Sequence, residues 1–325
     1  MNKYAEKIER FLLRTINKFV YHGHRAPKNI TLMSGEQLNQ YIYDGLMADA
    51  PFMVARFGSV ELDSALYTYL YGLPLLLRYK LYAQKKIEQL RPSSQKAHQL
   101  MNALCNNAGF FPNDINYLAE FGEKIRNEDT SCCCCCCCCW NKEDLMLPFF
   151  NEDIRFAKLE EMEPYDYSQP WSRALAGKKV LIIHPFADTI QQQYKKRTKL
   201  WKNPNVLPEF EIQTIKAVQS IAGEKTQFND WFEALKFMED QMDAIDYDIA
   251  IIGCGAYGFS LAAHAKRMGK KAIHLGGATQ ILFGIKGKRW DENPAVNKFY
   301  NEYWVYPSAA ETPQHKDRVE NGCYW

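Results

Sequence analysis

Short apolar runs alternate with amphipathic segments through the second half of the chain. Residues 180–183 and 249–252 are continuously apolar, and residues 272–275 form a third run of this kind. An amphipathic segment at 259–268 separates the second run from the third. Buried parallel strands have such runs, and strands that alternate with helices stack into βαβ units. The pattern therefore predicts an α/β fold, a Rossmann-like and mostly parallel sheet flanked by helices, with its Rossmann-like half at residues 177–306.

The first half of the chain predicts one strand among several helices. Residues 34–46 have a helical pattern with Ser34 as a candidate cap, and the apolar run 52–55 predicts a strand. Residues 81–127 have a mostly helical pattern. Because no glycine- or proline-rich linker long enough to separate domains interrupts the chain, we expect a single α/β domain over residues 34–325.

Residues 1–33 precede that domain and predict an N-terminal amphipathic helix. Ile8, Leu12, Ile16 and Phe19 recur at helical spacing with basic residues between them. Charges interrupt the apolar positions too often for a signal peptide or a membrane span. Such a helix packs on its own domain or on a partner, or it lies on an anionic membrane surface. We therefore expect a cytoplasmic protein, with peripheral association at the inner face of the membrane as the alternative.

The charges and cysteines narrow the function classes. The chain has 40 Lys and Arg against 38 Asp and Glu, so it lacks the basic excess of a dedicated nucleic-acid binder, and we expect no nucleic-acid partner. Eight of the eleven cysteines form the uninterrupted run 132–139, which fits neither a disulfide framework nor a spaced metal site, and we base no chemistry on it. The others, Cys105, Cys254 and Cys323, are far apart, as in a reducing compartment.

A glycine-rich loop follows the apolar run at 249–252. Gly253, Gly255 and Gly258 form G-x-G-x-x-G between a predicted strand and a predicted helix, the context in which this motif binds phosphate. A dinucleotide site would also need an acidic residue about 20 positions further on, and His274 occupies that region instead. The loop therefore predicts a phosphate or carboxylate ligand, and close helix–strand packing alone is the structural alternative.

Polar residues also follow two of the predicted strands. Arg56, Ser59 and Glu61 come after the strand at 52–55 and combine a cation suited to phosphate with a carboxylate that can hold a divalent metal or act as a base. An ordinary Arg–Glu ion pair is the alternative. His184 ends the next predicted strand, where an acid, a base or a substrate contact belongs, although a lone histidine is often structural.

Three charged segments remain. In residues 284–290 the cations alternate with glycines beside Trp290, which suits a phosphate and a stacked base or sugar. Asp246-Tyr247-Asp248 has a D-x-D pattern but precedes its strand, so we interpret it as a solvated turn. The basic side chains at 195–199 would suit a pyrophosphate or a membrane face, and a solvated helix face is the simpler interpretation.

Seven stretches of the chain together carry a family resemblance. They are residues 56–62, 109–112, 180–186, 207–210, 253–258, 276–290 and 322–325. Read together, these stretches resemble bacterial glycosyltransferases of the GT-D fold class and their relatives in capsule and surface-polysaccharide clusters. The resemblance spans most of the chain, and its C-terminal block is the most specific part.

The resemblance implies a GT-D-like fold, a nucleotide-sugar donor, and a divalent metal, Mg²⁺ or Mn²⁺, bound through a D-x-E motif after the first strand. Here that place is Ser59-Val60-Glu61, so Glu61 matches the second acid and Ser59 replaces the aspartate. A serine adds no negative charge to a hard-cation site, and Glu143 is a candidate for the missing carboxylate. The residues that we expect to bind the nucleotide-sugar are Arg56, Gly58, Ser59, Gly253, Gly255, Tyr257, Gly258, Gly276, Gly277, Gln280, Lys286, Arg289 and Trp290.

The leading hypothesis is a glycosyltransferase that passes a sugar to a saccharide or lipid-linked acceptor in surface-polysaccharide synthesis. The glycine loop would hold the donor diphosphate, and Arg56, Lys286 and Arg289 would neutralise its charge. Glu61 would hold a metal or orient the acceptor, and His184 would remove the acceptor proton. The alternatives are an NAD(P)-dependent oxidoreductase and a non-catalytic nucleotide-binding or scaffold protein of a polysaccharide assembly complex.

Overall fold

The computed structural model describes residues 31–128, 135–137, 142–150 and 154–325. The predicted N-terminal helix and most of the cysteine run lie outside these described residues. Within them, no helix is both long enough and apolar enough to cross a lipid bilayer.

The centre of the molecule is a parallel sheet of five strands in the order β2-β8-β7-β5-β6. The strands are β2 (Phe52–Val54), β5 (Lys179–His184), β6 (Glu211–Lys216), β7 (Ile249–Ile252) and β8 (Lys271–His274). Every pairing between neighbours is parallel. The predicted α/β class with a mostly parallel sheet flanked by helices is therefore confirmed.

The two halves of the chain contribute to this one sheet. Met53 pairs with Ala272 and Val54 with Ile273, so the strand predicted at 52–55 becomes an edge of the sheet formed by the second half. The opposite edge strand, β6, was not predicted, because only Ile215 among its residues is fully buried and its apolar signal is weak.

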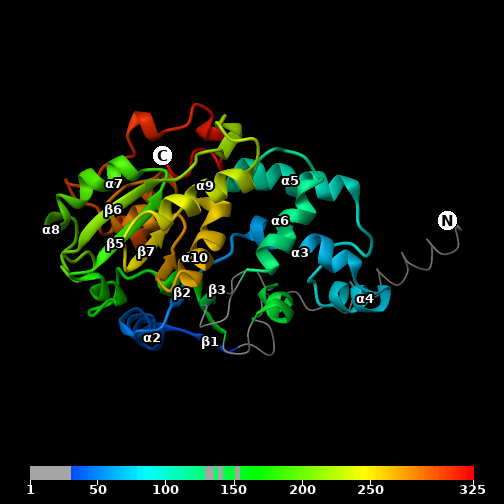
Figure 1. Ribbon diagram of the computed structural model, residues 1–325, viewed down its shortest axis with the longest axis horizontal. Helices are drawn as coiled ribbons and strands as arrows, with labels where there is room; N and C mark the ends of the chain where they lie inside the picture. Colours follow the sequence, from blue (N-terminus) through cyan, green and yellow to red (C-terminus); the bar gives the residue numbers. More distant parts are fainter. Residues whose placement is uncertain (1–30, 129–134, 138–141, 151–153) are drawn as a thin grey trace, which may run out of the picture.

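Helices cover both faces of the sheet (Figure 1). The α-helices are α2 (Gly35–Met47), α3 (Ser59–Gly72), α4 (Leu75–Ala83), α5 (Ser94–Ala108), α6 (Tyr117–Arg126), α7 (Ala187–Tyr194), α8 (Arg197–Leu200), α9 (Trp231–Asp243), α10 (Gly258–Arg267), α11 (Ala278–Leu282), α12 (Lys288–Asp291) and α13 (Pro294–Asn297). The 3₁₀-helices are η1 (Glu143–Phe149), η2 (Leu159–Met162), η3 (Trp171–Leu175), η4 (Ile221–Gly223), η5 (Gly255–Tyr257), η6 (Ala309–Glu311) and η7 (Lys316–Arg318).

Alternate residues of β5 divide the core into two layers. Leu181 and Ile183 pack with the buried faces of α3, α5, α6, α9 and α10. Val180 and Ile182 point the other way and pack with α2, α7 and α11. Side chains of a strand alternate between its two faces, so a run that is apolar at every position requires cover on both sides.

A second, smaller sheet lies beside the main one. It is parallel, has the order β1-β4-β3, and consists of β1 (Leu32–Met33), β4 (Arg155–Ala157) and β3 (Cys135–Cys137). Leu32 and Met33, which were predicted to end the N-terminal lead, therefore pair with residues of the domain.

The start of α2 is held differently from the sequence-based expectation. Ser34 is the residue that precedes the first turn, as predicted, but its side chain makes no cap hydrogen bond. The backbone N–H of Gly35 donates instead to the carboxylate of Glu161. An acceptor from a distant segment thus satisfies one of the unpaired N–H groups of the first turn.

The C-terminal segment docks back onto the domain. Trp325 is buried, and its indole N–H donates to the carbonyl oxygen of Glu311 at 3.3 Å. The Glu311 carboxylate accepts hydrogen bonds from the backbone N–H groups of Asp188 at 2.9 Å and Thr189 at 3.2 Å. Glu311 therefore places a negative charge at the N-terminus of α7, where the helix dipole favours it.

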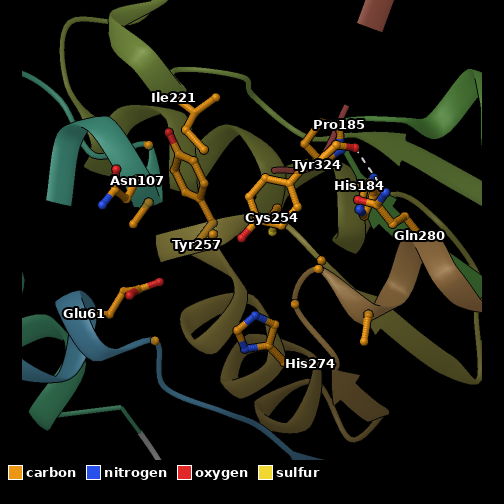
Figure 2. A pocket seen from close by; sticks show the side chains of 18 of the residues that line it. Glu61, Asn107, His184, Pro185, Ile221, Cys254, Tyr257, His274, Gln280 and Tyr324 are labelled. Atoms are coloured by element: carbon orange, nitrogen blue, oxygen red, sulfur yellow. Dashed lines mark hydrogen bonds between the residues drawn. The ribbon is translucent and has the colours of Figure 1, made fainter. Parts of the chain in front are cut away.

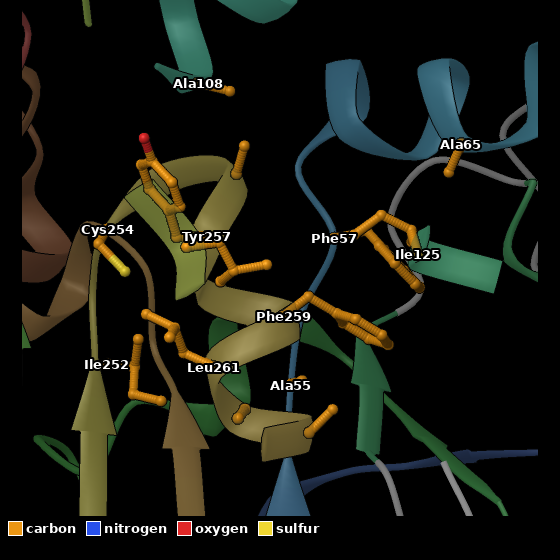
Figure 3. Close-up of a cluster of buried hydrophobic side chains, with 14 of the residues drawn as sticks. Ala55, Phe57, Ala65, Ala108, Ile125, Ile252, Cys254, Tyr257, Phe259 and Leu261 are labelled. Carbon is orange, nitrogen blue, oxygen red and sulfur yellow. The ribbon is translucent and has the colours of Figure 1, made fainter. Parts of the chain in front are cut away.

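Helix α10 packs closely on the sheet. Phe259 stacks on Phe57 with 4.5 Å between ring centroids, and Figure 3 shows this pair beside Leu261 and Ile252. At Gly258 a Cβ atom would lie 2.1 Å from Nε2 of His274, so only glycine fits between helix and strand.

We predict that Gly258→Ala lowers the free energy of unfolding by about 1–3 kcal/mol, because the added methyl group overpacks the α10–β8 contact. Denaturant unfolding measures this change. Gly72→Ala is the matched control: no atom lies within 4 Å of its Cβ position at the end of α3, so that variant should be neutral or stabilised by up to about 1 kcal/mol. Equal stability of the two variants would contradict the close packing.

Candidate functional site

A cavity opens where the order of the strands reverses. The chain leaves β5 toward β6 on one side and then returns to β7 on the other side of β5. His184-Pro185-Phe186 and Gly253-Cys254-Gly255 leave the carboxyl ends of β5 and β7 and line a cavity of about 490 Å³. Crevices at such reversal points are where open α/β sheets bind ligands, and this volume suits a small molecule.

The cavity collects residues from distant parts of the sequence. Glu61 lies on one side of it and His184 and Gln280 on the other, with Tyr257 and Tyr324 between them in this view (Figure 2). All of the predicted site residues except Gly258 and Lys286 line it. Those that line it are Arg56, Gly58, Ser59, Glu61, His184, Gly253, Gly255, Tyr257, Gly276, Gly277, Gln280, Arg289 and Trp290.

The prediction for Lys286 does not agree with the structure. Its ammonium lies 5.2 Å from the ring centroid of Tyr300 and 5.8 Å from that of Tyr306. The backbone N–H of Lys286 donates to the carbonyl oxygen of Val305 at 2.7 Å, and this bond fixes the backbone at this position. The cation therefore faces two aromatic rings rather than the cavity.

Each glycine of the G-x-G-x-x-G loop has a protein atom where a side chain would be. A Cβ at Gly253 would lie 2.5 Å from the carbonyl oxygen of Gly276, and one at Gly255 would lie 2.4 Å from that of Ala108. Gly258 is covered by His274, as described above. Close packing accounts for all three glycines, so the loop is not by itself evidence for a phosphate cradle.

Arg56 shares the cavity with two carboxylates whose pKa values are raised. Burial raises the pKa of Glu61, against the opposing effects of a hydrogen bond from its own backbone N–H and of the Arg56 charge. Burial also raises the pKa of Glu163 to about 7, against the opposing charge of Arg56. The charge of Arg56 thus acts on both carboxyl groups. Glu163 can exist in either protonation state near neutral pH, which is what proton transfer requires.

Sequence reasoning missed Glu163. It follows η2 rather than a strand, and it is one of four acidic residues between positions 160 and 166. Nothing in the sequence distinguishes it from the neighbouring Glu160, which is exposed. Only the three-dimensional path of the chain brings Glu163 to the cavity wall.

Glu61 has a structural role in addition to any chemical one. Its carboxylate folds back over the N-terminus of α3, where a Cβ on Gly58 would lie 2.1 Å from one of its oxygens. Ser59 is the first residue of that helix. A carboxylate in this position favours the helix through the unpaired N–H groups and the dipole.

His184 lacks the properties of the predicted base. The backbone N–H of Phe186 donates to Nδ1 of His184 at 3.0 Å, so the neutral ring carries its hydrogen on Nε2. Burial lowers the pKa of His184 to about 3. The ring is therefore uncharged at neutral pH and offers a hydrogen-bond donor instead of a proton acceptor.

Two buried polar atoms at the cavity have no partner among the described residues. They are Nδ1 of His274 and Oε1 of Gln280. The amide nitrogen of Gln280 donates to the carbonyl oxygens of Lys286 at 2.9 Å and Tyr324 at 3.1 Å, which fixes which end of the amide is the acceptor. Because an unpaired buried polar atom is costly, these two positions are suited to contact a bound ligand.

One wall of the cavity is aromatic and cationic. Tyr324 packs beside Trp290 with 6.0 Å between centroids, and the guanidinium of Arg289 lies 4.8 Å from the Tyr324 ring. Arg289 also pairs with Glu320, so its charge is partly balanced. Tyr257, which also lines the cavity, stacks on the buried Trp231 with 5.2 Å between ring centroids.

The described residues do not fit the implied divalent metal. Within them, no group of three or more His, Cys, Asp or Glu side chains is arranged to hold a metal ion. Ser59 stands where an aspartate is implied, and Glu143 is buried at the start of η1 and does not line the cavity. We derive no step through a metal.

The two remaining charged segments lie on the surface. Asp246 is exposed and pairs with Lys179 at 2.5 Å, and the carboxylate of Asp248 accepts the Lys179 N–H at 2.9 Å. This is the solvated turn predicted before β7. In the basic segment at 195–199, Arg197 pairs with Glu209 at 2.6 Å. The residues of this segment do not line the cavity.

No protein-family model matches the chain, and no curated protein matches it. Among solved structures, one titled "Selenomethionine substituted structure of domain of unknown function 1792 (DUF1792)" aligns with 94% of this chain and 98% of its own, at 12% identity and a TM-score of 0.40. A likeness this weak carries no argument about the fold or the site.

We predict that Glu163→Gln changes the pH dependence of stability. Because the pKa of Glu163 is raised in the folded state, its neutral carboxyl group contributes to the stability of the fold. That contribution is complete below the usual pKa of 4.5 and is lost as the pH rises through about 7. Between pH 5 and 8 the wild type should lose about 1–3 kcal/mol relative to the variant, measured by denaturant unfolding. Glu160→Gln is the exposed control, and identical pH profiles for all three proteins would refute the burial of Glu163.

Proposed function

We propose that the chain is a glycosyltransferase that uses a nucleotide-sugar donor. The observation that carries the proposal is one cavity that combines Arg56 with a carboxyl group, Glu163, that titrates near neutral pH. Sugar transfer needs both: a cation for the departing diphosphate and a base for the acceptor hydroxyl. The resemblance of the chain's motifs to the GT-D class supports the same proposal.

In the proposed reaction, the oxygen of an acceptor hydroxyl forms a bond to the anomeric carbon of the donor. The bond between that carbon and the diphosphate oxygen breaks, and the electron pair leaves with the diphosphate. Ionised Glu163 takes the hydroxyl proton. Arg56 stabilises the negative charge that develops on the leaving group, and Arg289 contributes from the rim of the cavity.

The neutral polar groups of the cavity would orient the substrates. Nε2–H of His184 can donate to a diphosphate oxygen without adding charge, and Oε1 of Gln280 can accept from a hydroxyl or an N–H of the donor. The ring of Tyr324 offers a face for a sugar or a base. Glu61 would accept a hydrogen bond from the acceptor while holding the start of α3.

The structure gives less support to the NAD(P)-dependent oxidoreductase. A dinucleotide site needs an acidic side chain at the end of the second strand of its βαβ unit, and here β8 ends at His274. A Cβ on Gly255 would lie 2.4 Å from the carbonyl oxygen of Ala108, so close packing explains this glycine without a pyrophosphate. A scaffold that binds no nucleotide is the remaining alternative. The proposal also includes the acceptor, which is a saccharide or a lipid-linked sugar, and a place in surface-polysaccharide synthesis at the cytoplasmic face. These parts of the proposal rest on the resemblance.

We predict that Arg56→Ala weakens nucleotide-sugar binding and that Lys286→Ala does not. Removing a charge-assisted contact to phosphate costs about 1.5–3 kcal/mol, or roughly a tenfold to hundredfold rise in Kd. Thermal shift with UDP-, GDP-, CDP- and TDP-sugars and with NAD(H) identifies the donor, and calorimetry then measures Kd. Equal affinities of the two variants, or stabilisation by NAD(H) alone, would overturn the proposal.

We predict that transfer by the wild type increases with pH and levels off above about 7, because only ionised Glu163 accepts a proton. Glu163→Gln should lower kcat by about 10²- to 10⁴-fold and remove this rise, with little change in donor Kd. Glu160→Gln should behave as the wild type. If Glu163→Gln keeps the pH profile at a reduced rate, another group is the base.

A further inference from the structure

Helix α4 presents three consecutive leucines to solvent. Leu75, Leu76 and Leu77 are 44%, 81% and 45% exposed, and α4 has no buried residue at all. The helix is attached to the core by Leu73 before it and by Leu81 and Tyr82 at its far end. It lies at the periphery, away from the five-stranded sheet (Figure 1). Exposed leucines scattered singly are ordinary, but three together form a patch that needs an explanation.

The arrangement of these leucines indicates what covers them. Neighbouring residues of an α-helix are about 100° apart, so three in a row sweep about 200° of its circumference. A protein groove covers one stripe of a helix. A lipid bilayer surrounds an inserted helix tip from all sides. These three leucines at the start of α4, which we call the leucine tip, therefore fit a bilayer better than a protein partner.

The charge around the tip favours an anionic surface. Residues 74–96 contain six Lys and Arg and a single acid, Glu88, although the whole chain carries a net charge of only +2. Lys96 pairs with Glu88, and Lys86 pairs with Asp144. Lys80 is exposed on α4 itself. Apolar insertion together with such a basic segment is how peripheral proteins bind anionic lipids.

We infer that the leucine tip of α4 and its basic flank dock the protein on an anionic lipid bilayer. This surface consists of other residues than the amphipathic segment expected within residues 1–33. It is also connected to the cavity: α3 begins at the cavity wall with Ser59 and ends at Gly72, directly before α4. At 1.5 Å per residue, the 14 residues of α3 place the start of α4 about 20 Å from the cavity end of that helix.

Vesicle flotation of the full chain tests the inference. Wild-type protein should float with phosphatidylcholine vesicles that contain phosphatidylglycerol, and this binding should weaken with salt and without the anionic lipid. The triple variant L75S/L76S/L77S should lose roughly tenfold or more of the binding, and Lys80→Glu should weaken it. Met268→Ser removes another exposed apolar side chain, 51% exposed, just after α10 and should bind as the wild type.

Three results would overturn the inference. The triple variant binds vesicles as tightly as the wild type, or Phe19→Asp in the N-terminal segment abolishes binding while the triple variant retains it. In the third, the wild type does not bind vesicles, and the triple variant instead changes oligomeric state in light scattering, which would assign the patch to a protein contact. Thermal unfolding shows that each variant is folded. None of these readouts depends on the enzymatic activity proposed above.

Discussion

The pairing of β2 with β8 determines where the candidate chemistry can occur. Three residues of the first half of the chain join the edge of a sheet formed by the second half, and Arg56 and Glu61 follow directly. Parallel strands end at the same edge, so this pairing brings the first-half side chains to the carboxyl ends of β5 and β7. Without it, the Rossmann-like half would supply the turn at His184 and the glycine loop but neither Arg56 nor Glu61.

Many polar groups line the cavity, but few of them carry a charge. Both histidines at its wall, His184 and His274, are neutral because burial lowers the pKa of each to about 3. Two carboxyl groups are shifted toward their neutral forms by the same burial. In such buried surroundings the charge of Arg56 acts more strongly on a charged ligand than it would in bulk water.

The sequence predicted the elements that are buried on both faces and the residues at their ends. The runs at 180–183 and 249–252 became central strands, and strand-end reasoning located Arg56, Glu61 and His184 at the cavity. It failed where periodicity carries no information. The half-exposed β6 gave too weak a signal, and alternation of cations with glycines does not determine side-chain direction, so Lys286 was misplaced. Glu163 was missed because a 3₁₀ connection, not a strand, brings it to the site. The tautomer of His184 depends on a backbone hydrogen bond that no pattern of residue types reveals.

The C-terminal segment contributes to two structures at once. Glu311 holds the start of α7, while Tyr324 and Trp325 line the cavity, and Trp325 also lies 6.1 Å from Phe186 in the turn after β5. A molecule that packs on Tyr324 therefore binds only when this segment is docked. By linkage, ligand binding and docking of the segment strengthen each other by the same free energy. The lifetime of the docked segment in the complex is then an upper limit on how long a bound product stays in place.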